Sequence, residues 1–231
     1  MNSMPVPWRP AFPESSLWAA EYTVTLPLIG ELPCRTTLMQ TPTSGTWVYS
    51  PGVGLADSLQ NTLGEEPLHL VAPNSFHHLG LSEWSTVYPQ ATTWVAPDAR
   101  SRLRKFGQEV QLLEAAKLPK EIIVQEIPES RAGEVWLLIC EDAGWVWLVG
   151  DAFFHLETAG HWSNRLFDNA PGCKVSRVFW WGRLRNRMAY RQRVETLLEK
   201  HRPHALIPCH GTSLTGKAVS EVMYHALSQR R

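Results

Sequence analysis

The fold of this chain is constrained most by a series of short apolar runs, each closed by glycine, proline or other turn residues. Runs of about four to eight residues that are rich in β-branched and aromatic side chains are typical of β-strands. The sequence predicts strands over residues 21–28, 35–40, 46–49, 68–72, 92–95, 122–127, 134–140, 145–149, 177–181 and 205–208. We therefore expect a protein built on β-sheets.

Helical spacing of apolar residues occupies several intervals between these strands. Helices are predicted over residues 55–63, 79–88 and 184–201, in a short basic segment with Asp98 as its N-cap, and from about residue 215. Strands come first along the chain, strand and helix then alternate, further strands follow, and the chain ends strand–helix–strand–helix. This order fits an α/β protein with two packed sheets and helices on their outer faces, a four-layer αββα sandwich.

Length, charge and cysteine content narrow the class of protein. The 231 residues suit a single domain, with residues 1–20 as an N-terminal extension. Basic and acidic side chains both number 22, so charge gives no reason to expect a nucleic-acid partner. The most apolar region, 135–149, is interrupted by Glu141 and Asp142, which predicts two strands and not a membrane span. Four widely spaced cysteines favour reduced thiols and a cytoplasmic location.

Three of the apolar runs end in side chains that can bind a metal ion. His77 and His78 follow the run 68–72, Asp151 follows 145–149, and His210 follows 205–208. Rigid strands aim the side chains of the loops that follow them, so α/β proteins often build sites there. Three imidazoles and one carboxylate suit zinc, iron or manganese. Each residue alone is typical of a structural histidine or of a Gly-Asp turn, and only the joint pattern favours a metal site.

The same segments resemble the metallo-β-lactamase superfamily. Residues 71–80 (VAPNSFHHLG) resemble a branch that has an Asn-x-x-His-His loop in place of the usual His-x-His-x-Asp-His. Residues 148–151 (LVGD) are similar to the Gly-Asp metal motif, residues 208–211 (PCHG) to the terminal His-Gly motif, and residues 47–51 (WVYSP) to an early strand. The resemblance extends from about residue 21 to the last helix and implies a four-layer sandwich of metallo-β-lactamase type.

Departures from the usual motif imply one metal ion and not two. When His78 is aligned with the last histidine of the motif, His77 stands at the aspartate position, and Pro73 and Ser75 replace two histidines of the first metal. No histidine lies between His78 and Asp151, where the third is expected. The resemblance thus implies a mononuclear site at His77, His78, Asp151 and His210, with zinc as the first expectation and iron or manganese as alternatives.

The activity implied by the resemblance is metal-dependent hydrolysis of an unidentified small molecule by a metal-activated water, with Asp151 as the catalytic residue. Asn74 and Arg183 are the substrate-binding candidates. Asn74 also suits a plain turn, and Arg183 belongs to a basic stretch, 174–193, that is either a solvated helix face or a rim for an anionic substrate.

Two other functions stay open at this point. The missing first-metal histidines are compatible with a non-catalytic scaffold that binds a ligand, and the ligand set is compatible with an iron-dependent oxidoreductase. The sequence also leaves a homodimer open.

Overall fold

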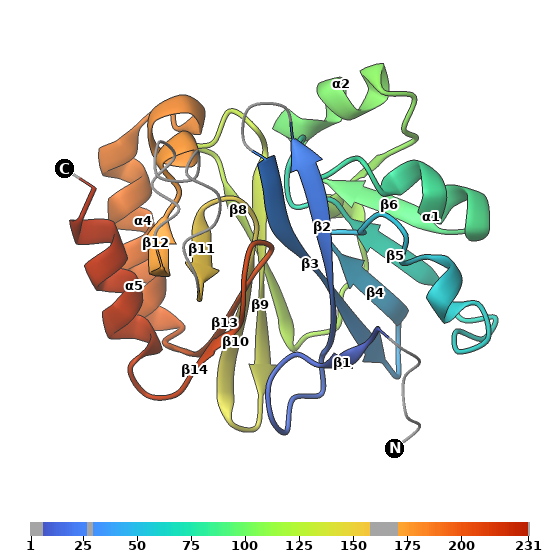
Figure 1. The fold of residues 1–231 in the computed structure, drawn as a ribbon, viewed down its shortest axis with the longest axis horizontal. Helices are drawn as coiled ribbons and strands as arrows, with labels where there is room; N and C mark the ends of the chain where they lie inside the picture. The colour runs from blue at the N-terminus through green and yellow to red at the C-terminus, as the bar shows by residue number, and fades with distance from the viewer. Residues whose placement is uncertain (1–6, 27–29, 158–170, 231) are drawn as a thin grey trace.

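The computed structural model describes residues 7–26, 30–157 and 171–230, and it has four layers (Figure 1). Two β-sheets face each other in the middle, with helices outside each sheet. The four-layer αββα sandwich predicted from the order of strands and helices is therefore the observed fold. Among the described residues, no helix is long and apolar enough to cross a membrane.

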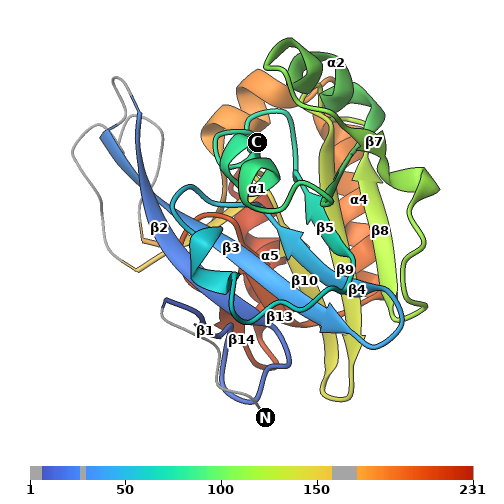
Figure 2. The ribbon, with the colours of Figure 1, turned by 90° about the vertical axis from the view of Figure 1, so that its right-hand side faces the viewer.

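The first sheet contains seven strands that lie in chain order. They are β1 (Arg9–Pro10), β2 (Trp18–Leu26), β3 (Gly30–Thr41), β4 (Gly45–Tyr49), β5 (Leu68–Val71), β6 (Thr92–Val95) and β7 (Gln111–Leu112). Strands β1 to β4 pair antiparallel, and β4 to β7 pair parallel. The β2–β3 ribbon extends beyond the other strands of this sheet on one side (Figure 2).

The second sheet contains five strands in the order β14, β13, β10, β9 and β8. Their bounds are β8 (Ile122–Ile127), β9 (Glu134–Glu141), β10 (Gly144–Val149), β13 (Pro203–Pro208) and β14 (Leu214–Thr215). Strands β10 and β13 pair parallel, and the other neighbours pair antiparallel. A small separate ribbon consists of β11 (Phe153–Leu156) and β12 (Gly172–Val175).

The helices and short helical turns complete the outer layers. Helices α1 (Leu81–Val87) and α2 (Pro97–Lys105) lie outside the first sheet, and α4 (Arg187–Lys200) and α5 (Val219–Ser228) lie outside the second. The short turns are η1 (Asp57–Leu59), η2 (Leu113–Ala115) and the π-helical turn η3 (Phe179–Arg183).

Three hydrophobic clusters fill the three spaces between the four layers. Strand β9 shows how one sequence serves two of them: Val135 and Leu137 point into the cluster between the sheets, whereas Trp136 and Leu138 point toward α4 and α5. A third cluster joins the first sheet to α1 and α2. Because central strands bury both faces, their sequences are continuous apolar runs, which is why the sequence located them well.

The structure corrects four local predictions. Residues 177–181 do not form a strand: Phe179 and Trp180 are buried side by side while Val178 and Trp181 are exposed, a spacing that suits the helical turn η3. The helix predicted over 55–63 is reduced to η1. Asp98 lies inside α2, because Pro97 occupies the first helical position and Ala96 is the N-cap. Residues 9–10 and 18–20, placed in an N-terminal extension, belong to the first sheet.

Candidate metal centre

Three strand ends from the two sheets meet at one edge of the sandwich. Parallel pairing of β10 with β13 sets Val149 beside Pro208, so Asp151 and His210 emerge next to each other two residues later. His77 comes from the loop after β5 in the opposite sheet. The site therefore lies where the carboxyl ends of strands from both sheets converge, as the sequence predicted.

The ligand atoms of His77, Asp151 and His210 all lie within 4.8 Å of one another. Oδ1 of Asp151 is 2.9 Å from Nε2 of His77 and 3.0 Å from Nε2 of His210. The histidine side chains are 8% and 5% exposed, and that of Asp151 is 22% exposed. The part of the chain that the structure describes contains no second group of this kind.

The outer nitrogen of each imidazole is held by a second contact. Nδ1 of His210 lies 3.1 Å from the carbonyl oxygen of Pro33, which can only accept, so Nδ1 carries the hydrogen and Nε2 is left to face Asp151. Nδ1 of His77 lies 2.9 Å from Oγ of Ser50. Metal-binding histidines are usually oriented by such a contact on the nitrogen away from the metal. The donor set therefore fits a divalent ion bound by two Nε2 atoms and one carboxylate oxygen.

Charge couples Asp151 to His210. Burial alone would raise the pKa of Asp151, but the charge of His77 and hydrogen bonds from both histidines hold it well below its usual range. Burial would likewise lower the pKa of His210, but Cys34 and the Asp151 carboxylate outweigh it and raise that pKa to about 10. Without a metal ion, the pair is therefore an ion pair in which His210 carries a proton that a metal would displace.

Ser50 is a site residue that the sequence did not reveal. It follows β4 directly, is completely buried, and has a φ of 58°, a left-handed conformation that non-glycine residues rarely adopt. Its backbone is fixed by hydrogen bonds from its own amide to Val71 and from Thr36 to its carbonyl, and its hydroxyl reaches His77. A strand was expected at residues 47–51. A serine gives no indication in the sequence that its backbone will adopt a positive φ and direct its hydroxyl toward His77.

The side chain of Asn74 is turned into the protein and stabilises the loop that carries His77. Its side chain is completely buried, donates through Nδ2 to Glu134 (2.8 Å) and accepts through Oδ1 from the amide of Phe76 (2.8 Å). The expectation that it binds substrate is therefore corrected: both polar ends of the amide are used within the protein. The turn interpretation of Asn74 describes it better, because these bonds set the conformation of the loop that carries His77.

Glu134 is a second residue that sequence reasoning missed. It is completely buried at the start of β9 and also accepts from Nε1 of Trp136 and the amide of Ala152. Burial and the nearby Asp151 carboxylate raise its pKa to about 8, and the three donated hydrogen bonds only partly offset them. The sequence did contain a signal for it. Glu134 alternates with Trp136 and Leu138 along the strand, so its carboxyl group shares their buried face.

His78 does not join the other three predicted ligands. Its ring stacks on Phe106 with the centroids 4.2 Å apart and the planes 9° apart. Burial and the charge of Arg102 lower its pKa. Adjacent residues of a tight turn project in different directions, so only His77 of the pair reaches Asp151. Cys209, next to His210, points into the cluster between the sheets.

A cavity of about 300 Å³ opens over the three ligands. The β2–β3 ribbon contributes Tyr22, Val24 and Leu32, and apolar side chains such as Phe154 and Phe179 cover other walls. Arg183 is the one lysine or arginine among its lining residues in the described structure. The arginine predicted to bind substrate thus lines the same cavity as the three candidate metal ligands.

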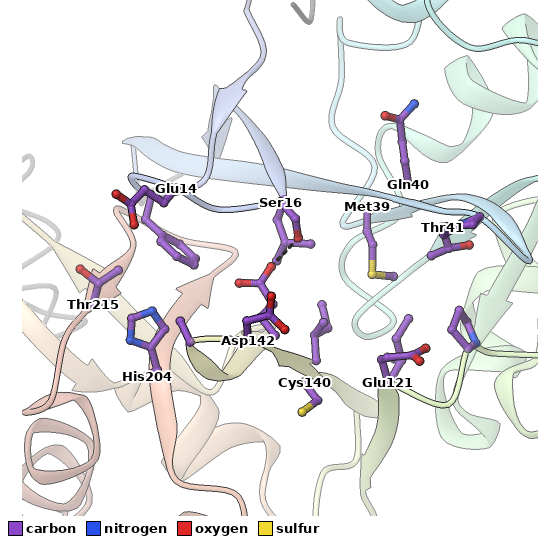
Figure 3. Close-up of a pocket in the computed structure, with 18 of the residues that line it drawn as sticks. Glu14, Ser16, Met39, Gln40, Thr41, Glu121, Cys140, Asp142, His204 and Thr215 are labelled. Atoms are coloured by element: carbon purple, nitrogen blue, oxygen red, sulfur yellow. Dashed lines mark hydrogen bonds between the residues drawn. The ribbon is translucent and has the colours of Figure 1, made fainter. Parts of the chain in front are cut away.

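A larger hollow lies elsewhere in the described structure. It measures about 830 Å³ and lies between the N-terminal segment, the end of β3 and the β9–β10 turn (Figure 3). It contains none of His77, Asp151 and His210. Of its carboxylates, Glu14 comes from the N-terminal segment and Asp142 from the β9–β10 turn, at the opposite end of β10 from Asp151. The smaller cavity is therefore the candidate active site.

No family model and no curated protein sequence matches this chain. Solved structures do. A metallo-β-lactamase from Hirschia baltica matches with a TM-score of 0.65 at 10% identity, over 96% of this chain and 98% of its own. DIM-1 metallo-β-lactamase matches with a TM-score of 0.68 at 10% identity, over 99% of this chain and 100% of its own. The chain has the metallo-β-lactamase fold.

Further solved structures match the chain as well. The metal-soaked Flv1 flavodiiron core from Synechocystis sp. PCC6803 matches with a TM-score of 0.62 at 13% identity, over 93% of this chain and 58% of that chain. FIM-1 from Pseudomonas aeruginosa, solved in a mono-zinc form, matches with a TM-score of 0.65 at 10% identity, over 98% of this chain and 97% of its own. Identities this low establish the fold, and the activity has to be argued from the site.

Proposed function

We propose that this protein is a metal-dependent hydrolase of a small molecule, with one divalent metal ion, zinc in the first instance, bound by His77, Asp151 and His210. The observation that carries this proposal is the convergence of two imidazole Nε2 atoms on one carboxylate oxygen at the bottom of a cavity. Three protein ligands with a fourth position open to a cavity are typical of catalytic zinc, whereas structural zinc has four protein ligands.

The chemistry divides between the metal ion and the protein. A divalent ion held there would act as a Lewis acid and supply an activated water. Asp151 is the catalytic residue in this proposal: its depressed pKa keeps the carboxylate ionised and able to bind metal at neutral pH. The apolar walls of the cavity limit the access of bulk water, and Arg183 orients the substrate. We also propose that the loop Asn74–His78 marks a branch of the fold with a single metal, and that the protein is cytoplasmic, which its four free thiols support.

A second function is favoured by the identity of the ligands. Two histidines and one carboxylate are also the set that binds iron in non-haem Fe(II) oxygenases, and manganese accepts the same donors. An iron-dependent oxidoreductase is therefore the alternative, and it predicts bound iron and oxygen consumption in place of chelator-sensitive hydrolysis.

Elemental analysis of protein purified without added metal tests the proposal. We expect about one metal ion per chain, lost in a His77→Ala/His210→Ala double variant and retained in His225→Ala, which removes an exposed histidine of α5. A panel of ester, lactam, thioester and phosphodiester substrates should then show turnover that chelator abolishes. An unchanged metal content in the double variant would reject the site. Bound metal without any chelator-sensitive turnover would instead indicate a non-catalytic scaffold.

A further inference from the structure

Two arginines beside the metal site share one aromatic ring. The guanidinium carbon of Arg183 lies 3.8 Å from the ring centroid of Phe76, and that of Arg102 lies 4.4 Å from it. Arg183 comes from η3 and Arg102 from α2, so two distant segments bring positive charge to the residue that precedes His77. Each stacking contact is favourable, but the two like charges repel each other.

The neighbouring arginines are already committed to other partners. Arg185 forms two hydrogen bonds to the carboxylate of Asp98 (2.8 and 3.0 Å), and Arg193 binds Glu129 (2.9 Å). Within the described residues, Arg183 and Arg102 have no carboxylate within ion-pair distance. Of the basic stretch, Arg183 is the described residue that lines the cavity, so its charge is the one available to a ligand there, and Arg102 stacks on the same Phe76 ring.

Arg183 is also firmly positioned. Its carbonyl accepts from the amide of Arg131 (2.8 Å), and the amide of Arg185 donates to Glu129 (2.7 Å), so η3 is fastened at its end to the loop before β9. The backbone of Phe76 is fixed in turn by the hydrogen bond that its amide donates to Oδ1 of Asn74. Preorganised guanidiniums lose little conformational freedom on binding and suit planar or tetrahedral oxyanions.

We propose that Arg183, which lines the cavity, and Arg102, which stacks on the same Phe76 ring, form an oxyanion-binding subsite, and that the substrate has an apolar body and one carboxylate or phosphate group. This inference rests on the proposed function, since it describes the substrate of the same cavity. The volume of about 300 Å³ admits a small molecule, and the apolar walls match a hydrocarbon or aromatic body. The oxyanion would be the counter-ion for the positive charges of the two arginines.

Binding of three matched probes tests the subsite. The probes are 4-phenylbutyrate, 4-phenylbutyl phosphate and the neutral 4-phenylbutanol, titrated by calorimetry into metal-loaded and chelator-treated protein. We expect at least one charged probe to bind about tenfold or more tighter than the alcohol, in both preparations, because charged hydrogen bonds contribute this much and do not depend on the metal. The comparison of carboxylate with phosphate identifies the group that the subsite prefers.

Substitutions test whether the two arginines cause the tighter binding of the charged probes. Arg183→Gln and Arg102→Gln should each reduce it about tenfold, whereas Arg104→Gln, two residues along α2 and so on its opposite side, should leave it unchanged. Arg183→Lys retains charge and should keep part of the preference. Thermal melts monitor folding, and if Arg183→Gln does not fold, the exposed Arg102→Gln decides.

The outcomes separate this inference from the proposed function. Equal binding of charged and neutral probes, a preference that survives both glutamine variants, or one that disappears with chelator would overturn the subsite. A preference retained by protein that binds no metal would uphold the subsite while the hydrolase proposal fails. Chelator-sensitive hydrolysis that is unchanged in both glutamine variants would support the hydrolase proposal and overturn the subsite.

Discussion

The affinity of the site for zinc should rise steeply with pH, because the metal must displace a proton from His210. The Nδ1 hydrogen of His210 is engaged with Pro33, so the displaced proton is the one on Nε2, 3.0 Å from Asp151. Because the pKa of His210 is about 10, pH 7 lies roughly three units below it, and the proton stays bound. At about 1.36 kcal/mol per unit, its removal costs about 4 kcal/mol. The apparent affinity should therefore increase about tenfold for each pH unit between 6 and 8.

Competition with a chromophoric chelator of known proton affinity measures this dependence. Zinc dissociation constants at pH 6, 7 and 8 should fall by about a hundredfold in total, following the tenfold dependence on each unit. Calorimetry in two buffers of different ionisation enthalpy should count at least one proton released per zinc ion. His225→Ala, which changes an exposed histidine, serves as the control and should show the same slope. A nearly constant affinity with no proton release would refute the assignment of the charged pair.

Three further predictions concern single residues. His78→Ala should retain one metal ion per chain while His77→Ala loses it, because His78 stacks away from the site; equal loss in elemental analysis would restore His78 as a ligand. Ser50→Ala should weaken zinc binding about 10- to 100-fold by removing the contact to Nδ1 of His77. Ser50→Gly should weaken it similarly but melt at a higher temperature than Ser50→Ala, since glycine adopts the φ of 58° without strain of about 1 kcal/mol. Leu137→Ala, which opens a cavity between the sheets, should lower the free energy of unfolding in urea by about 2–5 kcal/mol. Met188→Ala, at an exposed position, is the control and should lower it by less than about 0.5 kcal/mol.

Local sequence pattern predicted the strands that carry the site because their burial is uniform. Strands β9, β10 and β13 bury both faces over most of their length, and each contains an apolar run with a clear end. Asp151 and His210 follow two of these ends by two residues, so their convergence could be inferred before any contact was known. The fold and three of the four predicted ligands rest on this logic.

The remaining features depend on contacts between segments that are far apart in the chain. Ser50 contacts a histidine 27 residues away, and Asn74 contacts Glu134 at a separation of 60 residues. No local pattern reports which residue a side chain will meet across the sandwich. His77 and His78 were both predicted as ligands because the two residues are chemically identical, and only the conformation of their loop decides which one faces Asp151.

The charge of the site connects the histidine at position 77 with the arginines at its rim. A carboxylate at this position, as in the usual motif, together with Asp151 would neutralise a divalent ion. Two neutral imidazoles and one carboxylate instead leave one positive charge, while Glu134, with its pKa raised to about 8, offers little compensation at neutral pH. Arg183 adds further positive charge in the same weakly solvated cavity, where electrostatic interactions are strong. A metal ion bound as proposed and Arg183 would both attract negative charge, so we expect the cavity to disfavour a cationic substrate and to favour an anionic one.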